Sequence, residues 1–262
     1  MIAALSACGF VVDVTVEGLL HATERGPILS TGTRVLMVSN EHPEVLARLL
    51  PDPALKAKVQ KGVAMAKAAR QMRVTSASGT DLVVEMANAN VGGGWGFADE
   101  PGMMAHWPGG LCAFYAREGA VNGTVVMDCG DLNLTFKRYL DTPIRLTIEN
   151  DFIVDITGPG LDAALMRSYF EAWEDRNAYA VAHLGWGMNP TARWDALTMY
   201  DRNDINGTEQ RAFAGNFLFS TGSNRFANRY TQGHFDLPMR NCSIALDGKV
   251  IVDAGRLAPE LA

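Results

Sequence analysis

The segment Gly233-His234-Phe235-Asp236 carries the sharpest chemical signal in the sequence. In an extended chain, residues two positions apart point to the same side, so the His234 imidazole and the Asp236 carboxylate are presented together. A neutral imidazole and a carboxylate are two of the three ligands in the two-histidine, one-carboxylate sites that bind divalent metals. The alternative is a hydrogen-bonded His–Asp pair inside the core.

A second histidine, His183, lies in a glycine-rich stretch that ends at Asn189-Pro190. Two glycines, Trp186 and the Asn-Pro pair within eight residues predict a tight loop that exposes one imidazole. The alternative is a histidine packed beneath Trp186, because no second ligand is near it in the sequence.

Residues 97–110 form a long Gly/Pro-rich segment that contains Asp99, Glu100 and the pair His106-Trp107. Long loops with polar and aromatic side chains often carry binding sites. The alternative is a surface loop whose acids face water. The preceding glycine run, residues 91–96, is followed by neither Lys-Ser/Thr nor a helix start, so we exclude a phosphate-binding loop.

Arg211 stands at the start of a strand-like run that ends at a turn near Gly222. Its guanidinium could clamp an anionic group of a substrate, and a structural salt bridge is the alternative. His42, which precedes Pro43 at a predicted helix start, is interpreted as a solvated capping residue.

Composition excludes several classes of protein. The 262 residues carry a net charge of -6 without a Lys/Arg run, which argues against nucleic-acid binding. No apolar stretch reaches the roughly 20 residues that span a membrane. The four cysteines are far apart and form no C-x-x-C pair, so neither a zinc site nor a disulfide framework is expected. The apolar start lacks the basic region of a signal peptide, and we expect a cytoplasmic protein.

The fold class expected from the elements is α/β plus α+β. Strands at 10–16 and 34–39, with a short helix between them, predict an incomplete parallel α/β unit over residues 1–73, with helix from Pro43 to Arg73. Two strands make an incomplete sheet. We therefore expect either that the chain begins partway through an α/β domain or that a neighbouring subunit of a homo-oligomer covers the edge, and several tryptophans that we expect to be exposed also favour assembly.

A larger mixed α+β domain, which would bind the metal, is expected over residues 74–262. Strands are predicted at 80–86 and 123–130, and a helix is predicted over 160–177. Hairpins are predicted at 144–156, around Asn150-Asp151, and at 242–253, around Asp247-Gly248.

Together, several stretches of the sequence resemble the 2,5-dihydroxypyridine 5,6-dioxygenases, a family related in fold to the thermophilic-type metalloaminopeptidases. The resemblance covers essentially the whole chain, in order and with similar spacing. The stretches that carry it are His21 with its flanks, Ile28–Arg34, Ala98–Gly102, His106-Trp107-Pro108, His183–Gly187, Asp201–Asp204, Arg211–Phe213, Gly215–Gly222, His234–Asp236 and Pro238–Cys242.

The resemblance implies a non-haem Fe(II) enzyme that opens a dihydroxylated pyridine ring with O2 to an N-formylmaleamate-type product. The iron ligands would be His183, His234 and Asp236. His21 and His106 would act as acid/base and orienting residues, and Arg211 and Glu100 are the candidate substrate-binding residues. The family carries a glutamate twelve residues before the histidine of His-Trp-Pro, and Gly94 stands there in this chain.

Two other functions compete with the dioxygenase. A metal-dependent aminopeptidase-like hydrolase would need several bridging carboxylates, for which Glu174 and Glu209 are the nearest candidates in the sequence. A non-catalytic remnant is the third hypothesis, because the first two thirds of the family's N-terminal α/β domain are absent from this sequence and Gly94 replaces an acid.

Overall fold

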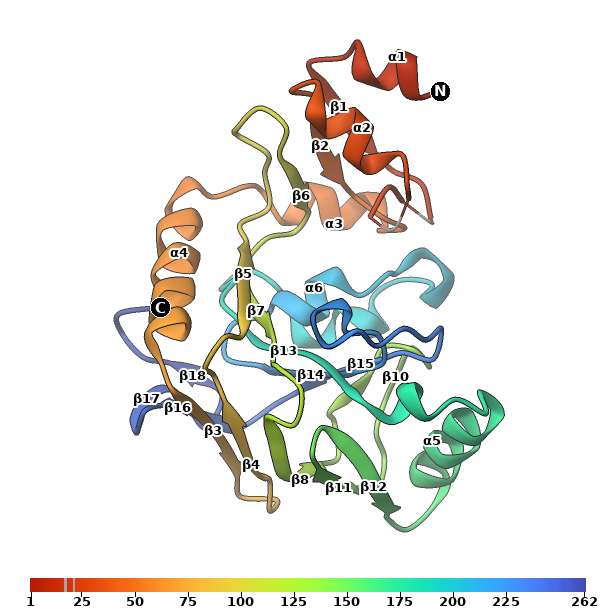
Figure 1. Cartoon of the computed structure of the whole chain (residues 1–262), viewed down its shortest axis with the longest axis vertical. Helices are drawn as coiled ribbons and strands as arrows, with labels where there is room; N and C mark the ends of the chain where they lie inside the picture. The colour runs from red at the N-terminus through yellow and green to blue at the C-terminus, as the bar shows by residue number, and fades with distance from the viewer. Residues whose placement is uncertain (17, 21) are drawn as a thin grey trace.

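The computed structural model describes residues 1–16, 18–20 and 22–262. A small unit that contains the N-terminus stands above a larger body (Figure 1). The small unit is a parallel sheet of order β1-β2-β6, formed by β1 (Phe10–Asp13), β2 (Arg34–Met37) and β6 (Met104–His106). Helices α1 (Ile2–Ser6) and α2 (Arg25–Ser30) accompany these strands.

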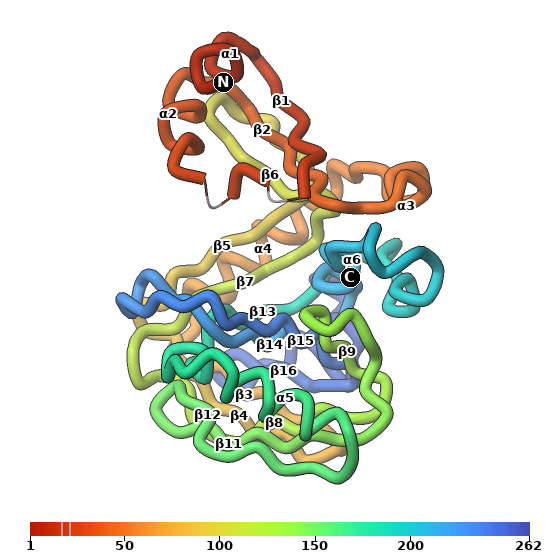
Figure 2. The backbone as a smooth tube through the Cα atoms, turned by 90° about the vertical axis from the view of Figure 1, so that its right-hand side faces the viewer, coloured from red at the N-terminus to blue at the C-terminus, as the bar shows by residue number. Residues whose placement is uncertain are grey.

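The expectation of only two strands in the small sheet was wrong. The third strand, β6, comes from the Gly/Pro-rich segment that was predicted as a loop, and it pairs with β2 from Val35↔Met104 to Met37↔His106. Figure 2 shows the three strands side by side, with β6 leading on toward the larger body. A three-residue strand between glycines and prolines has too few residues to give a recognisable alternation in the sequence.

Two capped helices follow β2. In α3 (Pro43–Arg48), the His42 side chain caps the N-terminus by accepting a hydrogen bond from the Glu44 N–H, as a capping residue should. Helix α4 (Pro53–Ala68) is capped in the same way by Asp52. The predicted helix to Arg73 extends too far, because β3 begins at Gln71.

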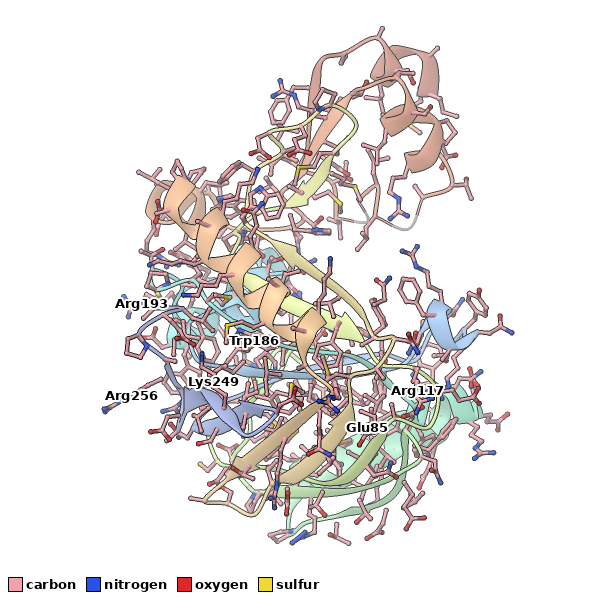
Figure 3. The ribbon with its side chains drawn as sticks, turned by 60° about the vertical axis from the view of Figure 1, so that its left-hand side comes forward. Glu85, Arg117, Trp186, Arg193, Lys249 and Arg256 are labelled. Carbon is pink, nitrogen blue, oxygen red and sulfur yellow. The ribbon has the colours of Figure 1, made fainter. Side chains whose placement is uncertain are left out.

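Helix α4 packs against the larger body, although the predicted boundary at 73/74 placed it with the small unit. Leu55, Val59 and Ala66 on its buried face belong to the main hydrophobic core. Trp186 lies beside this helix (Figure 3), and a Cβ at Gly62 would lie 3.2 Å from the Met188 sulfur and 3.6 Å from the Trp186 ring. Trp107 and Trp186 are both buried, so the expectation that several tryptophans are exposed was wrong for these two.

The larger body contains an eight-stranded sheet of order β12-β11-β8-β4-β3-β16-β17-β18 and a five-stranded sheet of order β15-β14-β13-β7-β5. Side chains from both sheets form one continuous core. The hairpins predicted around Asn150-Asp151 and Asp247-Gly248 are confirmed. In the eight-stranded sheet the strands are β3 (Gln71–Ser76), β4 (Asp81–Glu85), β8 (Val121–Met127), β11 (Ile144–Glu149), β12 (Phe152–Thr157), β16 (Cys242–Leu246), β17 (Lys249–Asp253) and β18 (Arg256–Leu257).

The five-stranded sheet is antiparallel throughout. Its strands are β5 (Asn90–Gly94), β7 (Leu111–Tyr115), β13 (Val181–Gly187), β14 (Phe217–Thr221) and β15 (Phe235–Met239). The remaining elements are α5 (Leu161–Ala172), α6 (Thr208–Ala212), the short pair β9 (Leu132–Asn133) and β10 (Arg138–Tyr139), and the 3-10 turns η1 (Arg176–Tyr179), η2 (Trp194–Thr198), η3 (Arg202–Asp204) and η4 (Arg225–Ala227). Among the described residues, no helix is both long and apolar enough to cross a membrane.

Strand β13 corrects the prediction of a loop around His183. Its glycines mark close backbone approach, not a turn. A Cβ at Gly185 would lie 2.2 Å from the Cys112 carbonyl oxygen, and a Cβ at Gly187 would lie 2.1 Å from the Phe213 carbonyl oxygen. Glycine in the interior of a strand often marks a place where another backbone comes this near.

We therefore expect Gly185→Ala to destabilise the fold by about 2–3 kcal/mol, because β7 must move away from β13. The measurement is the urea unfolding midpoint. Gly92→Ala is the matched control, since a Cβ at Gly92 in β5 has no atom within 4 Å. Equal midpoints for the two variants would contradict this packing.

Candidate metal centre

Three adjacent strands of the five-stranded sheet position the candidate ligands. His183 is on β13 and Asp236 is on β15, with β14 between them, and His234 directly precedes β15. In the β14–β15 pairing, Asp236 is opposite Ser220 of β14. The β13–β14 register is irregular between Val181 and Leu184, and there the Ser220 hydroxyl accepts from the His183 N–H and donates to the His183 carbonyl. Ser220 thereby fixes the backbone of His183 relative to Asp236.

The three side chains converge although their segments are about fifty residues apart. His183 Nε2 lies 3.2 Å from Asp236 Oδ1, and His234 Nε2 lies 3.2 Å from Asp236 Oδ2. One ligand atom from each residue can be chosen so that all three lie within 4.8 Å of one another, the spacing of groups that could hold one metal ion.

Backbone contacts set the orientation of His234. Its Nδ1 lies 2.6 Å from the Thr221 carbonyl oxygen, which can only accept a hydrogen bond. In the neutral ring the proton is therefore assigned to Nδ1, which leaves Nε2, the nitrogen next to Asp236, available to a metal. The His234 carbonyl accepts from the hydroxyl groups of Thr135 and Tyr169. The ring is thus pre-oriented to offer Nε2 to a metal.

Asp236 is buried, and Arg211 supplies its principal counter-charge. Arg211 Nε donates to Asp236 Oδ2 at 2.7 Å. Burial alone would raise the pKa of Asp236, but the Arg211 guanidinium and then the two imidazoles hold it well below the usual range. The carboxylate is therefore an ionised ligand at neutral pH.

The charge of His234 depends on the same carboxylate. Burial by itself would lower the pKa of His234, while its attraction and hydrogen bond to Asp236 raise it above the ordinary value. A bound metal must displace the proton that this pKa favours.

The donor set fits a divalent metal. Asp236 Oδ1 is buried without a hydrogen-bond partner, which is costly for a carboxylate oxygen unless a cation binds it. Two imidazole nitrogens and one carboxylate oxygen are the ligands of the two-histidine, one-carboxylate centres, which leave coordination positions open.

Of the other predicted site residues that the structure describes, one lies at this centre and the rest do not belong to it. Arg211 lies at the centre, and the salt bridge weighed as an alternative is present. Glu100 lies in the segment between β5 and β6, is 74% exposed, and is 3.9 Å from Lys56 of α4. His106 ends β6 in the small sheet and does not belong to the cluster found among the described residues. His21 lies outside the described residues.

Gly94 is displaced from the candidate ligands along the sheet. It pairs with Leu111, whereas Asn90 at the other end of β5 pairs with Tyr115, the neighbour of His183. Four residues of strand separate the two ends by about 13 Å. The missing carboxylate at this position would not lie beside the three ligands.

Sequence reasoning missed the aromatic side chains near His183. The Tyr115 ring meets the His183 ring edge-on with centroids 5.7 Å apart, and the Phe226 ring lies 5.4 Å from Tyr115. Tyr115 is on β7, and its only signal is the alternation of that strand. Ser220 and Thr221 lie in a stretch that carries the family resemblance, but nothing in their spacing indicated contacts with the histidines.

The fold and this set of ligands define the class, a mixed α+β protein with a candidate two-histidine, one-aspartate metal centre. A family model described as 2,5-dihydroxypyridine 5,6-dioxygenase matches residues 1–259, and the chain belongs to that family. A curated protein named 2,5-dihydroxypyridine 5,6-dioxygenase, from Pseudomonas putida strain KT2440, is 43% identical over 260 residues, which are 98% of this chain and 73% of the relative.

Two solved structures resemble the fold. The structure of 2,5-dihydroxypyridine dioxygenase from Pseudomonas putida KT2440 has a TM-score of 0.93 and 42% identity, and the match covers 100% of this chain and 75% of that one. Wild-type AmpT from Thermus thermophilus has a TM-score of 0.61 and 15% identity, covering 98% and 78%. The second likeness shows a shared fold and nothing more.

We expect divalent metal affinity to fall as the pH is lowered from about 8 to about 5.5, because protons compete with the metal for the ligand nitrogens of His183 and His234. Below the pKa of His234, protonation of that ring alone should reduce the affinity about tenfold per pH unit. Asp236 stays ionised throughout this pH range, so its carboxylate adds no further pH dependence to the metal affinity. The measurement is a Co(II) titration at several pH values, and an affinity independent of pH would contradict this assignment.

Proposed function

We propose that this protein is a ring-cleaving dioxygenase that opens 2,5-dihydroxypyridine with O2, using Fe(II) held by His183, His234 and Asp236. Membership of the family supports the reaction. The observation that supports the proposal for the site is the buried carboxylate of Asp236, whose Oδ1 has no hydrogen-bond partner and lies 3.2 Å from His183 Nε2, while its Oδ2 lies 3.2 Å from His234 Nε2.

The chain's own residues bind and orient the reactants. His183, His234 and Asp236 would hold the metal with three protein ligands, which would leave coordination positions for a substrate oxygen and for O2. When bound, Fe(II) supplies a path for electron density from an ionised hydroxypyridine to O2, which amino-acid side chains do not provide. The ionised Asp236 favours binding of the cation, and its contact with Arg211 keeps the carboxylate in place.

Tyr115 and Phe226 are proposed to hold the flat ring of the substrate. Tyr115 meets the His183 ring, Phe226 packs against Tyr115, and Phe226 is exposed at the surface. Aromatic rings favour offset-stacked or edge-on contact with another ring. This arrangement would keep the pyridine plane beside the metal ligands and exclude water from one face.

His106 and His21 are proposed to move the proton of a substrate hydroxyl. His106 is at the carboxyl end of the parallel strands of the small unit, where loops of α/β sheets commonly bind ligands. A histidine has the ordinary pKa for acid/base work near neutral pH. We leave Glu100 out of the site, because it lies beside α4.

The hydrolase alternative lacks its ligands. Two metals need several carboxylates within a few ångströms, but the cluster found among the described residues contains one. Glu209 is engaged in a two-point ion pair with Arg48. Glu174, the other candidate, is likewise not part of the cluster.

The proposal is tested by purifying the protein anaerobically, measuring bound metal and following O2 uptake with 2,5-dihydroxypyridine. We expect one iron per chain and uptake that depends on the substrate. Two zinc or manganese ions with peptidase turnover would support the hydrolase instead. Protein that binds no metal would support the remnant hypothesis.

We expect His234→Ala to abolish metal binding, since two ligands cannot replace the three-ligand set. His106→Ala should retain the metal and slow turnover by about 10²- to 10⁴-fold, the usual contribution of a general acid or base. His42→Asn is the control, because it keeps an acceptor at the cap of α3. Wild-type metal content in His234→Ala would refute the ligand assignment.

We further propose a cytoplasmic homo-oligomer. All four cysteines are free thiols, as is usual in reducing compartments. Phe10 and Val12 are exposed on β1, the edge strand of the small sheet, and Val14 is exposed just after it. Exposed apolar residues on a sheet edge favour contact with another chain.

If β1 mediates assembly, Val12→Asp should lower the mass measured by light scattering to that of one chain. Val154→Asp is the control, since Val154 is equally exposed on a different sheet. An unchanged mass for Val12→Asp would exclude β1 as the interface.

A further inference from the structure

Helix α6 contacts both helix α3, which follows β2 of the small sheet, and the candidate metal centre. Glu209 and Arg211 are two residues apart on this helix, so they point to nearly opposite sides, about 200° apart. Glu209 contacts Arg48 of α3, and Arg211 contacts Asp236 of β15. A shift of α6 would therefore change both the contact with Arg48 and the contact with Asp236.

The contact of α6 with α3 is a buried two-point ion pair. Arg48 Nη1 and Nη2 donate to Glu209 Oε1 and Oε2 at 2.6 and 2.7 Å. The Glu209 side chain is only 2% exposed, and its Oε1 also accepts from the Arg193 N–H. A parallel pair of charged hydrogen bonds fixes direction as well as distance, so it holds the two helices in one arrangement.

A second side chain from the small unit's side of the molecule fixes the start of α6. Glu41, which follows β2, accepts from the Thr208 N–H at 3.1 Å. Glu41 also forms an isolated bridge with Ile205, and the Asn40 amide donates to the Asn203 carbonyl. The segment before α6 and its first turn are therefore attached to residues 40–48.

The contact on the other side orients a metal ligand. Arg211 Nε binds Asp236 Oδ2, and Arg211 Nη1 donates to the carbonyl and side-chain oxygens of Asn206. With Oδ2 held by the guanidinium, Oδ1 is the oxygen left buried without a partner beside His183. The position of Arg211 therefore determines which way the carboxylate faces.

We propose that Glu209 and Arg48 are positioning residues for the metal centre, holding α6 so that Arg211 binds Asp236 Oδ2 and leaves Oδ1 directed toward His183. This inference rests on the metal site of the proposed function, but not on its substrate. The Leu49 carbonyl, directly after α3, also accepts a hydrogen bond from the Trp107 indole N–H. The same helix thus supports the strand that carries His106.

The test compares two variants that each break a buried arginine–carboxylate pair. Glu209→Gln breaks the pair with Arg48, and Asp162→Asn breaks the pair with Arg138 at the start of α5. The carboxylate side chains are both 2% exposed, and the arginines are 23% and 24% exposed, so the two pairs are matched in burial. The probe is Co(II), titrated anaerobically into metal-free full-length protein, with thermal unfolding measured alongside.

We expect Glu209→Gln to weaken Co(II) binding about tenfold, in the range of other residues that orient metal ligands. Asp162→Asn should change the affinity less than about twofold while lowering the unfolding temperature to a similar degree. Arg48→Lys keeps the charge but loses the two-point geometry, and it should weaken binding in the same direction by a smaller factor. It serves as the readout if Glu209→Gln fails to fold.

A double-variant cycle tests whether Glu209 acts through Arg211. Arg211→Gln should weaken Co(II) binding, and Glu209→Gln/Arg211→Gln should bind no more weakly than Arg211→Gln alone. Three results would each overturn the inference. The first is a loss of Co(II) affinity in the double variant that equals the sum of the two single losses. The second is wild-type affinity in both Glu209→Gln and Arg48→Lys, and the third is a loss of affinity in Asp162→Asn equal to that in Glu209→Gln. Wild-type protein that binds no Co(II) would overturn it together with the metal centre, whereas absent O2 uptake with normal Co(II) binding would count against the proposed reaction alone.

Discussion

The buried carboxylate of Asp236 is the constraint on which the site depends. A carboxylate removed from water is destabilised unless positive charge or hydrogen-bond donors surround it. Here the compensation comes from Arg211 on α6, His183 on β13 and His234 before β15, so three separate segments must arrive in the correct register. Ser220 and Thr221 on β14 supply that register by binding the backbone of one histidine and the ring of the other. Rigid strands are suited to this task, because a metal centre tolerates little displacement of its ligands.

Local patterns predicted local structure well. The hairpins at Asn150-Asp151 and Asp247-Gly248 follow from turn residues between alternating strands. The pairing of His234 with Asp236 follows from their spacing. The glycines near His183 misled the prediction, because a glycine that lets two strands approach is indistinguishable in sequence from one that permits a turn. The contact of Tyr115 with His183 and the contact of Arg211 with Asp236 both depend on the order of strands in the sheet. The spacing of residues in the sequence does not predict that order.

Family resemblance and local chemistry contributed different parts of the functional picture. The His-x-Asp spacing indicated a metal but left a structural pair open, and the resemblance added His183 as the third member. The structure adds what neither could supply, namely that Asp236 presents one oxygen to Arg211 and leaves the other beside His183. It also separates Glu100 and Gly94 from the ligands, because both lie toward the end of β5 that is remote from Tyr115.

The crossing of β6 from the larger body into the small sheet makes the two parts interdependent. Residues 104–106 complete a sheet whose other strands end by residue 37, and Trp107 beside them packs with Val38, Val45 and Leu49. Expressing residues 74–262 alone would therefore leave a strand without its neighbour and an indole without its pocket. Residues 1–73 alone would lack the third strand of their sheet. In this family member a domain is a spatial unit and not a contiguous stretch of chain, so grafting or swapping the small unit requires exchanging both of its segments together.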